Sequence, residues 1–156
     1  MKSPDQIHKQ EDKMTSTLEG KEGLQPAIQV LRKVAEQFNA LENEAKIFSV
    51  EASKQAYASE ADYSSAKENR AKCIEKLEER AQLLVDLPNR LIDTLENIDQ
   101  KTKQQILDTV HSFATQAQGA LESEEKYKFF ALNILLTSKG EKKGDTNDLE
   151  KLIESL

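Results

Sequence analysis

The chain has 156 residues, enough for one domain with a modest core and too few for two independent domains. Its 28 acidic and 22 basic residues give a formal net charge of −6, which repels a phosphate backbone, and no basic run stands beside stacking aromatic residues. We therefore expect no nucleic-acid partner. The one cysteine, Cys73, excludes an internal disulfide and suits a reducing cytosol. We expect a cytoplasmic protein in which Cys73 is a small, buried apolar residue.

The composition favours long helices. Residues 24–118 contain no glycine, and the prolines within them are Pro26 and Pro88. Glycine costs a helix interior about 1 kcal/mol and proline about 3 kcal/mol relative to alanine. Ala, Leu, Glu, Lys and Arg supply 74 of the 156 residues, close to the roughly one half that is typical of coiled coils and long helices. The sequence therefore predicts an all-α protein.

The first 23 residues differ from the rest. They are polar and charged, contain Pro4, Gly20 and Gly23, and show no sustained apolar period. Such a segment predicts a flexible polar arm, with a short helix over residues 6–18 as the alternative. No apolar region follows Met1, and no segment approaches the ~18 apolar residues of a membrane span, so we expect neither a signal peptide nor a transmembrane helix.

A very long helix is predicted after this arm. Apolar residues recur in steps of three and four from Leu24, pass through a section of small residues at 52–66, and regain bulk before Asp86. One helix over residues 24–86 would be roughly 95 Å long. The small residues either let another helix approach closely or fill a less buried section. No turn is predicted there, because glycine, proline and Asn-Gly are all missing. The first part of the stripe consists of Ile28, Leu31, Ala35, Phe38, Leu41, Ala45, Phe48 and Ala52.

Return helices are predicted to cover this stripe. Pro88 either kinks the chain or reverses it into a second helical region that extends to Leu121. Thr102 and Gln105 match a capping box, which indicates a break near residues 99–102, and Gly119 marks the next interruption. A hydrophobic helix then begins at Ser123 and ends at Gly140.

A short tail helix completes the prediction. Asp145 or Thr146 caps it, and it presents Leu149, Leu152, Ile153 and Leu156. The resulting organisation is a flexible arm (1–23), an elongated, coiled-coil-like helical domain (24–139), and a linker with a short C-terminal helix (140–156). Because the long stripe exceeds what the remaining residues can cover, we also expect a homo-oligomer.

The sequence offers little for catalysis or metal binding. Asp108 and His111 are the one approximation to the Glu-x-x-His pattern of di-iron helical bundles, and the pattern occurs once, with Asp in place of Glu. Cys73 has Arg70 and Lys76 near it on a helix but no general base. No glycine-rich phosphate loop, nucleophile elbow or zinc-protease motif is present. We therefore expect no enzyme, no cofactor and no metal, and interpret His111 as a partly exposed residue at the edge of the stripe.

The segment from Tyr127 to Leu136 departs from the amphipathic pattern. Its apolar residues occupy nearly the whole helix circumference, which is typical of a central helix of a bundle or of a helix that also meets a partner. Lysines on both sides would suit an anionic surface, although Glu122, Glu124 and Glu125 offset them. We rank a partner protein or a second copy above a lipid surface. The predicted interaction surface consists of Phe129, Phe130, Leu132, Ile134 and Leu135.

The functional prediction is a non-enzymatic helical protein–protein interaction module, such as a scaffold, adaptor or regulatory subunit, that self-associates through helix–helix contacts. The first alternative is reversible membrane-surface binding through residues 127–136 and their flanking lysines Lys126, Lys128, Lys139, Lys142 and Lys143. The second alternative is a helical-bundle enzyme or metalloprotein that uses Asp108 and His111.

Overall fold

The computed structural model describes residues 4–137 and 147–156, and the side chains of these residues from position 23 onward. The described residues form helices, turns and loops without a β-strand, which confirms the predicted all-α class. The elements are α1 (Pro4–Ala56), α2 (Tyr63–Ile92), the 3-10 turn η1 (Asp93–Leu95), α3 (Gln100–Leu121), α4 (Glu125–Asn133) and α5 (Asp148–Ser155).

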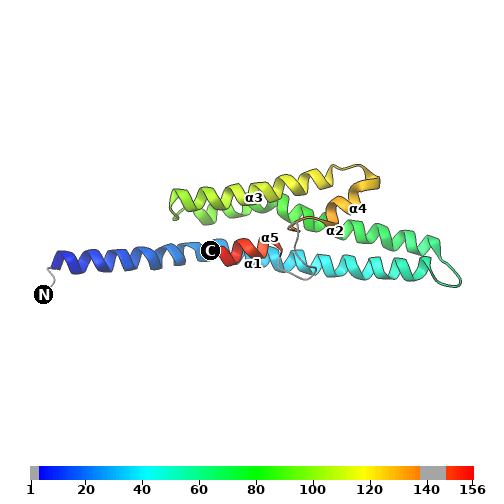
Figure 1. Ribbon diagram of the computed structural model, residues 1–156, viewed down its shortest axis with the longest axis horizontal. Helices are drawn as coiled ribbons and strands as arrows, with labels where there is room; N and C mark the ends of the chain where they lie inside the picture. The colour runs from blue at the N-terminus through cyan, green and yellow to red at the C-terminus, as the bar shows by residue number, and fades with distance from the viewer. Residues whose placement is uncertain (1–3, 138–146) are drawn as a thin grey trace.

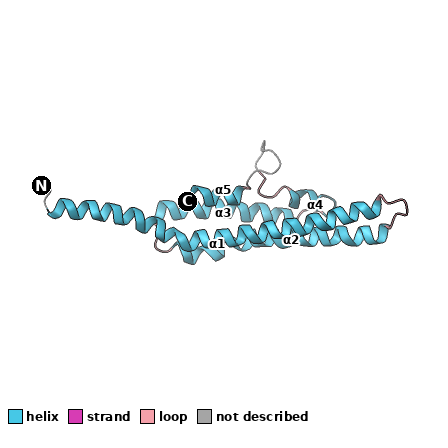
Figure 2. Cartoon of the chain, turned by 90° about the horizontal axis from the view of Figure 1, so that it is seen from below, coloured by secondary structure: helices cyan, strands magenta, loops and turns pink. Residues whose placement is uncertain are grey.

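The helices form an elongated bundle (Figures 1 and 2). α1 and α2 form an antiparallel hairpin, and α3 returns along α2 in the opposite direction (Figure 1). The short helix α4 follows α3 and packs on both α2 and α3, whereas α5 packs on α1. The α1–α2 hairpin extends beyond α4 at one end of the molecule (Figure 1). The prediction of a very long N-terminal helix with antiparallel return helices is therefore confirmed.

The N-terminal part of α1 projects past the bundle at the other end (Figure 1). The sequence predicted a flexible arm over residues 1–23, but α1 begins at Pro4 and runs through Gly20 and Gly23. A Cβ at Gly23 would lie 3.5 Å from the Asn97 carbonyl oxygen, so α1 passes the turn between α2 and α3 at this point. Two glycines cost about 1 kcal/mol each, a cost that the surrounding helix formers offset.

The predicted single helix over residues 24–86 is wrong. α1 ends at Ala56, residues 57–62 form a loop, and α2 begins at Tyr63. The Asp62 backbone N–H donates to the Gln55 carbonyl oxygen (3.0 Å), and the Asp62 carboxylate accepts from the Ser65 backbone N–H (3.0 Å). That N–H···carboxylate bond caps α2 and lowers the pKa of Asp62. The chain therefore turns here with an aspartate cap on α2 and without a glycine or proline, the residues from which a turn was expected.

The small-residue section at 52–66 spans the hairpin loop. Ala52 and Ala66, at its two ends, are buried between α1 and α2, whereas residues 57–64 are exposed, so most of the section is the less buried of the two alternatives. Pro88 neither ends α2 nor reverses the chain: it is buried inside α2, which continues to Ile92.

The reversal after α2 occurs over residues 93–99. Asp99 caps α3 by accepting a hydrogen bond from the Thr102 backbone N–H at 2.9 Å, which also lowers the pKa of Asp99. The break predicted near residues 99–102 is confirmed, although Thr102 is the capped residue rather than the cap. Gly119 does not interrupt α3, which continues to Leu121.

The predicted end of the hydrophobic helix at Gly140 is also wrong. α4 ends at Asn133, and the next residues turn back so that Leu135 and Leu136 are buried. Leu136 adopts a left-handed conformation (φ 62°), which a leucine holds only where packing enforces it. Its carbonyl oxygen accepts from the Asp148 backbone N–H at 3.1 Å, which joins the end of α4 to the start of α5.

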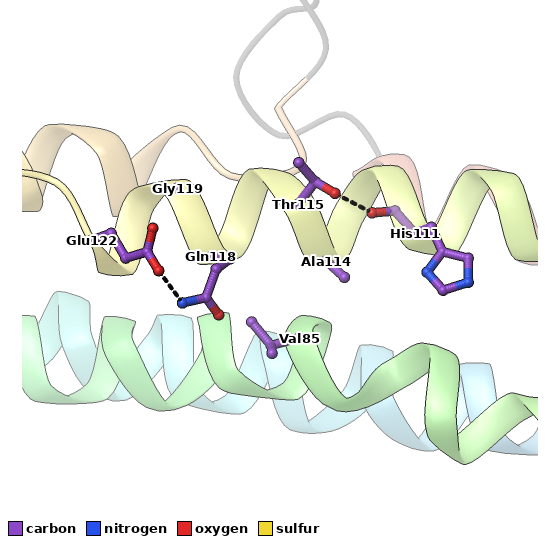
Figure 3. Close-up of a pocket in the computed structure, with 7 residues that line it drawn as sticks. All are labelled: Val85, His111, Ala114, Thr115, Gln118, Gly119 and Glu122. Atoms are coloured by element: carbon purple, nitrogen blue, oxygen red, sulfur yellow. Dashed lines mark hydrogen bonds between the residues drawn. The ribbon is translucent and has the colours of Figure 1, made fainter.

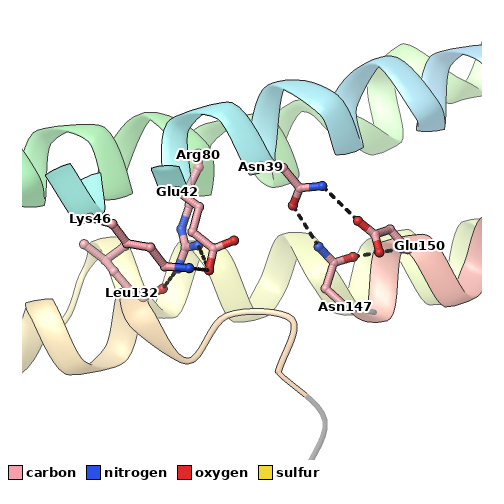
Figure 4. A network of polar contacts seen from close by, with 7 residues as sticks. All are labelled: Asn39, Glu42, Lys46, Arg80, Leu132, Asn147 and Glu150. Atoms are coloured by element: carbon pink, nitrogen blue, oxygen red, sulfur yellow. Dashed lines mark hydrogen bonds and ion pairs between the residues drawn. The ribbon is translucent and has the colours of Figure 1, made fainter. Parts of the chain in front are cut away.

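α5 is fixed to α1 by apolar and polar contacts. Leu149 is fully buried, and the Asn39 amide donates to the Glu150 carboxylate at 2.8 Å (Figure 4). Asn147 caps α5 by accepting from the Glu150 backbone N–H at 2.9 Å. The predicted caps Asp145 and Thr146 lie outside the described residues. No helix among the described residues is long and apolar enough to cross a membrane.

Candidate functional site

α4 has two different faces. Its inner side is buried: Leu132 is 0% exposed, and Leu135 in the following turn is 6% exposed. Tyr127, Phe130 and Ile134 are 58%, 68% and 50% exposed. Their spacing of three and four residues places them along one side of the helix, away from Leu132. We call these three residues the α4 outer face; Phe129, at 41% exposure, lies outside it, closer to Leu132 around the helix.

A buried cation holds the inner side of α4 in place. Arg80, on α2, is 2% exposed, and its guanidinium Nη2 donates to the Leu132 carbonyl oxygen at 2.7 Å (Figure 4). The guanidinium also lies 4.6 Å from the centre of the Phe38 ring and 3.9 Å from the Glu42 carboxylate. Burial lowers the pKa of Arg80, and the Glu42 charge opposes this effect. One residue thus connects α1, α2 and α4.

Both lysines of α4 form ion pairs within the chain. Lys128 lies 3.1 Å from the Glu78 carboxylate of α2, and Lys126 lies 3.7 Å from Glu124. The Lys128 side chain is 24% exposed, so it belongs to the contact between α4 and α2. These two lysines were part of the predicted membrane-facing set; the other members, Lys139, Lys142 and Lys143, lie outside the described residues.

The structure divides the predicted interaction surface into two groups. Phe129, Phe130 and Ile134 are exposed, whereas Leu132 and Leu135 belong to the core. The sequence reading treated the segment as apolar all round and did not select Tyr127. The spacing of Tyr127, Phe130 and Ile134 groups these three residues on one side of the helix, but it does not say which side faces the core.

Exposed apolar side chains gather at the hairpin end of the molecule. Nine large hydrophobic residues among the described side chains are exposed; three of them lie on α4, and Ile134 directly follows it. Four more belong to the α1–α2 hairpin near its loop; we call them the hairpin-end group. Ile92, at the C-terminus of α2, is the ninth and lies at the opposite end of that helix. The hairpin-end group consists of Ile47, Val50, Tyr57 and Tyr63.

Asp108 and His111, the residues of the metalloprotein alternative, do not belong to a cluster of metal ligands in the described part of the chain. The Asp108 carboxylate accepts from the Gln104 side-chain amide at 2.7 Å, and His111 is exposed on α3. No group of three or more His, Cys, Asp or Glu residues within the described part of the chain is placed to hold a metal ion. His111 instead lines an open groove of about 480 Å³ between α2 and α3 (Figure 3). The other lining residues are Val85, Ala114, Thr115, Gln118, Gly119 and Glu122.

Gly119 in this groove offers a simple stability test. A Cβ added there meets nothing within 4 Å, and the residue lies inside α3. We expect Gly119→Ala to raise the free energy of unfolding by about 0.5–1 kcal/mol, because alanine restricts the unfolded chain and favours helix. Urea denaturation followed by circular dichroism measures the change. A destabilised variant would mean that the groove is narrower than described.

Cys73 is buried as predicted, at 3% exposure. Burial raises the pKa of its thiol, an effect that the Arg80 and Arg70 charges partly oppose. Because the pKa is raised, the native thiol keeps its proton at alkaline pH values at which the unfolded thiol has already lost it. The stability that Cys73 contributes is therefore complete below the unfolded pKa of 9.0 and declines as the pH rises above it.

Denaturation of the wild type and Cys73→Ala between about pH 7 and pH 10 tests this expectation. As the pH rises towards 10, the wild type should lose unfolding free energy relative to Cys73→Ala. The same difference at every pH would contradict a buried, neutral thiol.

Comparison with known proteins adds no family. No protein-family model matches the chain, and neither the curated proteins nor the solved structures gave a match.

Proposed function

We propose that this protein is a non-enzymatic helical interaction module that binds a protein partner through the α4 outer face. The observation that carries the proposal is the division of α4 into two sides. Leu132 is fully buried, while Tyr127, Phe130 and Ile134 on the other side are each at least half exposed. Stability of the bundle explains the buried side, and the exposure of the outer side supports a role in binding.

The chemistry of the outer face supports protein binding. Two aromatic residues and one isoleucine at spacings of three and four are the kind of anchors with which a helix meets a groove or another helix. Aromatic residues dominate binding energy at protein interfaces. The three side chains of the outer face offer roughly 300–400 Å², at about 150–250 Å² for a large aromatic side chain. Patches of roughly 300–600 Å² are the largest on typical monomers and are often functional.

The architecture suits a scaffold, adaptor or regulatory subunit. Arg80 joins α4 to α1 and α2, so the outer face sits on a rigid base rather than on a mobile loop. A preorganised surface avoids part of the entropy cost of binding. Membrane-surface binding is the weaker alternative, because Lys128 is engaged with Glu78.

Site-specific photo-crosslinking tests the proposal. A photoreactive phenylalanine analogue at position 130, in the full chain in cells, should give a discrete crosslinked product. The same analogue at position 92 is the control, since Ile92 is also exposed (45%) but lies far from α4 along α2. No product at position 130, or equal products at both positions, would contradict binding through the α4 outer face.

A further inference from the structure

We infer that α5 controls the α4 outer face: α5 detaches from α1 as a unit while the rest of the bundle stays folded, and its release frees Ile134 from its fixed position. The inference rests on the proposed function and adds a regulatory step to it. Three features support it: the few contacts that hold α5, the hydrogen bond that joins α5 to the end of α4, and the backbone conformation of Leu136.

Few apolar side chains hold α5 on the bundle. The helix has eight residues and packs on α1, and it is shorter than the ~12–15 residues that an isolated helix needs in water. Leu149 is its one fully buried side chain, whereas Leu152, Ile153 and Leu156 are partly buried against the core. Segments with few buried apolar contacts open locally, at a free energy below that of global unfolding. α5 is therefore suited to detach while α1, α2 and α3 stay folded.

The polar contacts of α5 with α1 do not prevent this release. The Asn39 amide donates to the Glu150 carboxylate at 2.8 Å, and the Asn147 amide donates to the Asn39 side-chain oxygen at 3.4 Å (Figure 4). All three side chains are partly buried, so water replaces these hydrogen bonds when α5 detaches. The bonds set the position of α5 along α1 and add little to its net stability.

One hydrogen bond joins the start of α5 to the end of α4. The Asp148 backbone N–H donates to the Leu136 carbonyl oxygen at 3.1 Å. Leu136 is 1% exposed and has a φ of 62°, in the left-handed region that costs a leucine free energy. A strained conformation persists only where the surrounding structure holds it. Release of α5 removes this hydrogen bond, which lets Leu136 leave the left-handed conformation.

The turn after α4 carries the change to the outer face. Ile134 is the C-cap of α4, two residues before Leu136. The Thr137 backbone N–H donates to the Ile134 carbonyl oxygen at 3.1 Å, which closes the turn around Leu136. A new backbone conformation at Leu136 breaks this bond and frees Ile134, whereas Tyr127 and Phe130 lie earlier in α4 and keep their places. The outer face then loses one of its three anchors.

Amide hydrogen exchange of the full chain, followed by NMR, tests the release of α5. The Asp148 and Lys151 amides report on α5, and the Thr137 amide reports on the turn after α4. In the wild type we expect one common protection factor for these three amides. It should be at least about a hundredfold below that of Leu84, in the middle of α2.

Two variants separate local release from global unfolding. Leu149→Ala should lower the protection of Asp148, Lys151 and Thr137 together by at least about thirtyfold, because it removes the one fully buried side chain of α5. Val110→Ala, at a fully buried position of α3, should lower the protection of α2 and leave that of the three amides unchanged. Circular dichroism checks the fold, and Leu152→Ala replaces Leu149→Ala if that chain unfolds.

Two exchange results would overturn the inference. Equal protection of α5 and the middle of α2 in the wild type would mean that α5 opens only when the whole bundle unfolds. Faster exchange of Asp148 and Lys151 in Leu149→Ala, without faster exchange of Thr137, would mean that α5 detaches without freeing the end of α4.

Photo-crosslinking at position 130 tests the effect on partner binding. In the Leu149→Ala chain the product should fall at least about fivefold, because one anchor is lost whenever α5 is released. Glu154→Ala, at an exposed position of α5, is the matched control and should leave the product unchanged. Equal products from Leu149→Ala and the wild type would overturn the control of the outer face by α5. No product from the wild type would contradict the proposed function instead, and the exchange results would still decide whether α5 frees the end of α4.

Discussion

Replacing Leu132 with alanine should lower the free energy of unfolding by about 3 kcal/mol, within the 2–5 kcal/mol range of buried Leu→Ala changes. Leu132 is 0% exposed, and its backbone oxygen holds the Arg80 guanidinium. The substitution removes apolar contacts and leaves a cavity beneath α4, where neighbouring helices limit relaxation. Urea denaturation followed by circular dichroism measures the loss.

Phe130→Ala is the matched control, in the same helix and two residues earlier. Phe130 is 68% exposed, so its truncation should change stability by less than about 1 kcal/mol. Similar losses for the two variants would mean that α4 does not have one core side and one solvent side.

Two substitutions of Arg80 should have very different effects on the free energy of unfolding. We expect Arg80→Ala to cost about 3 kcal/mol, because it removes the stacking on Phe38 and the hydrogen bond to Leu132 and opens a cavity. Arg80→Met should lie within about 1 kcal/mol of the wild type, since methionine fills much of the space and avoids burying a charge. Chemical denaturation of the three proteins measures both differences.

The reasons for the mild Arg80→Met effect are local. The guanidinium Nε has no hydrogen-bond partner among the residues that the structure describes, so the wild-type cation is incompletely satisfied there. The Leu132 oxygen keeps a hydrogen bond from the Leu135 backbone N–H at 3.3 Å, and Glu42 is near enough to the surface to be hydrated (37% exposed). A loss for Arg80→Met as large as that for Arg80→Ala would mean that the charge, rather than the packing, connects the helices.

Periodicity predicted the helical elements better than the turns. The stripe that includes Leu31, Phe38 and Ala45 is buried as expected, but it packs against α2, whose residues were predicted to continue the same helix. The loop at residues 57–62 was missed because Asp62 caps α2 without the help of glycine or proline. Pro88 was predicted to kink or reverse the chain, yet the chain reverses only after Ile92. Side-chain caps decide these boundaries, and a four-residue cap pattern is too common in a polar sequence to identify by itself.

The sequence predicted only part of the candidate surface correctly. The sequence selected the correct segment, but it grouped Leu132 and Leu135 with Phe130 because all three are apolar. Which side of α4 faces the core depends on contacts with distant residues, above all Arg80, 52 positions from Leu132. A buried arginine that bonds a backbone oxygen leaves no local periodic signal, so only the assembled bundle assigns the two sides of α4.

Hydroxyl-radical footprinting of the dilute protein tests the central claim most directly. The account predicts strong modification of Tyr127 and Phe130 and strong protection of Leu132 and Leu135 in the same helical segment. Protection of Phe130 equal to that of Leu132 at the lowest concentration would contradict it, because the α4 outer face would then be core rather than a surface for a partner.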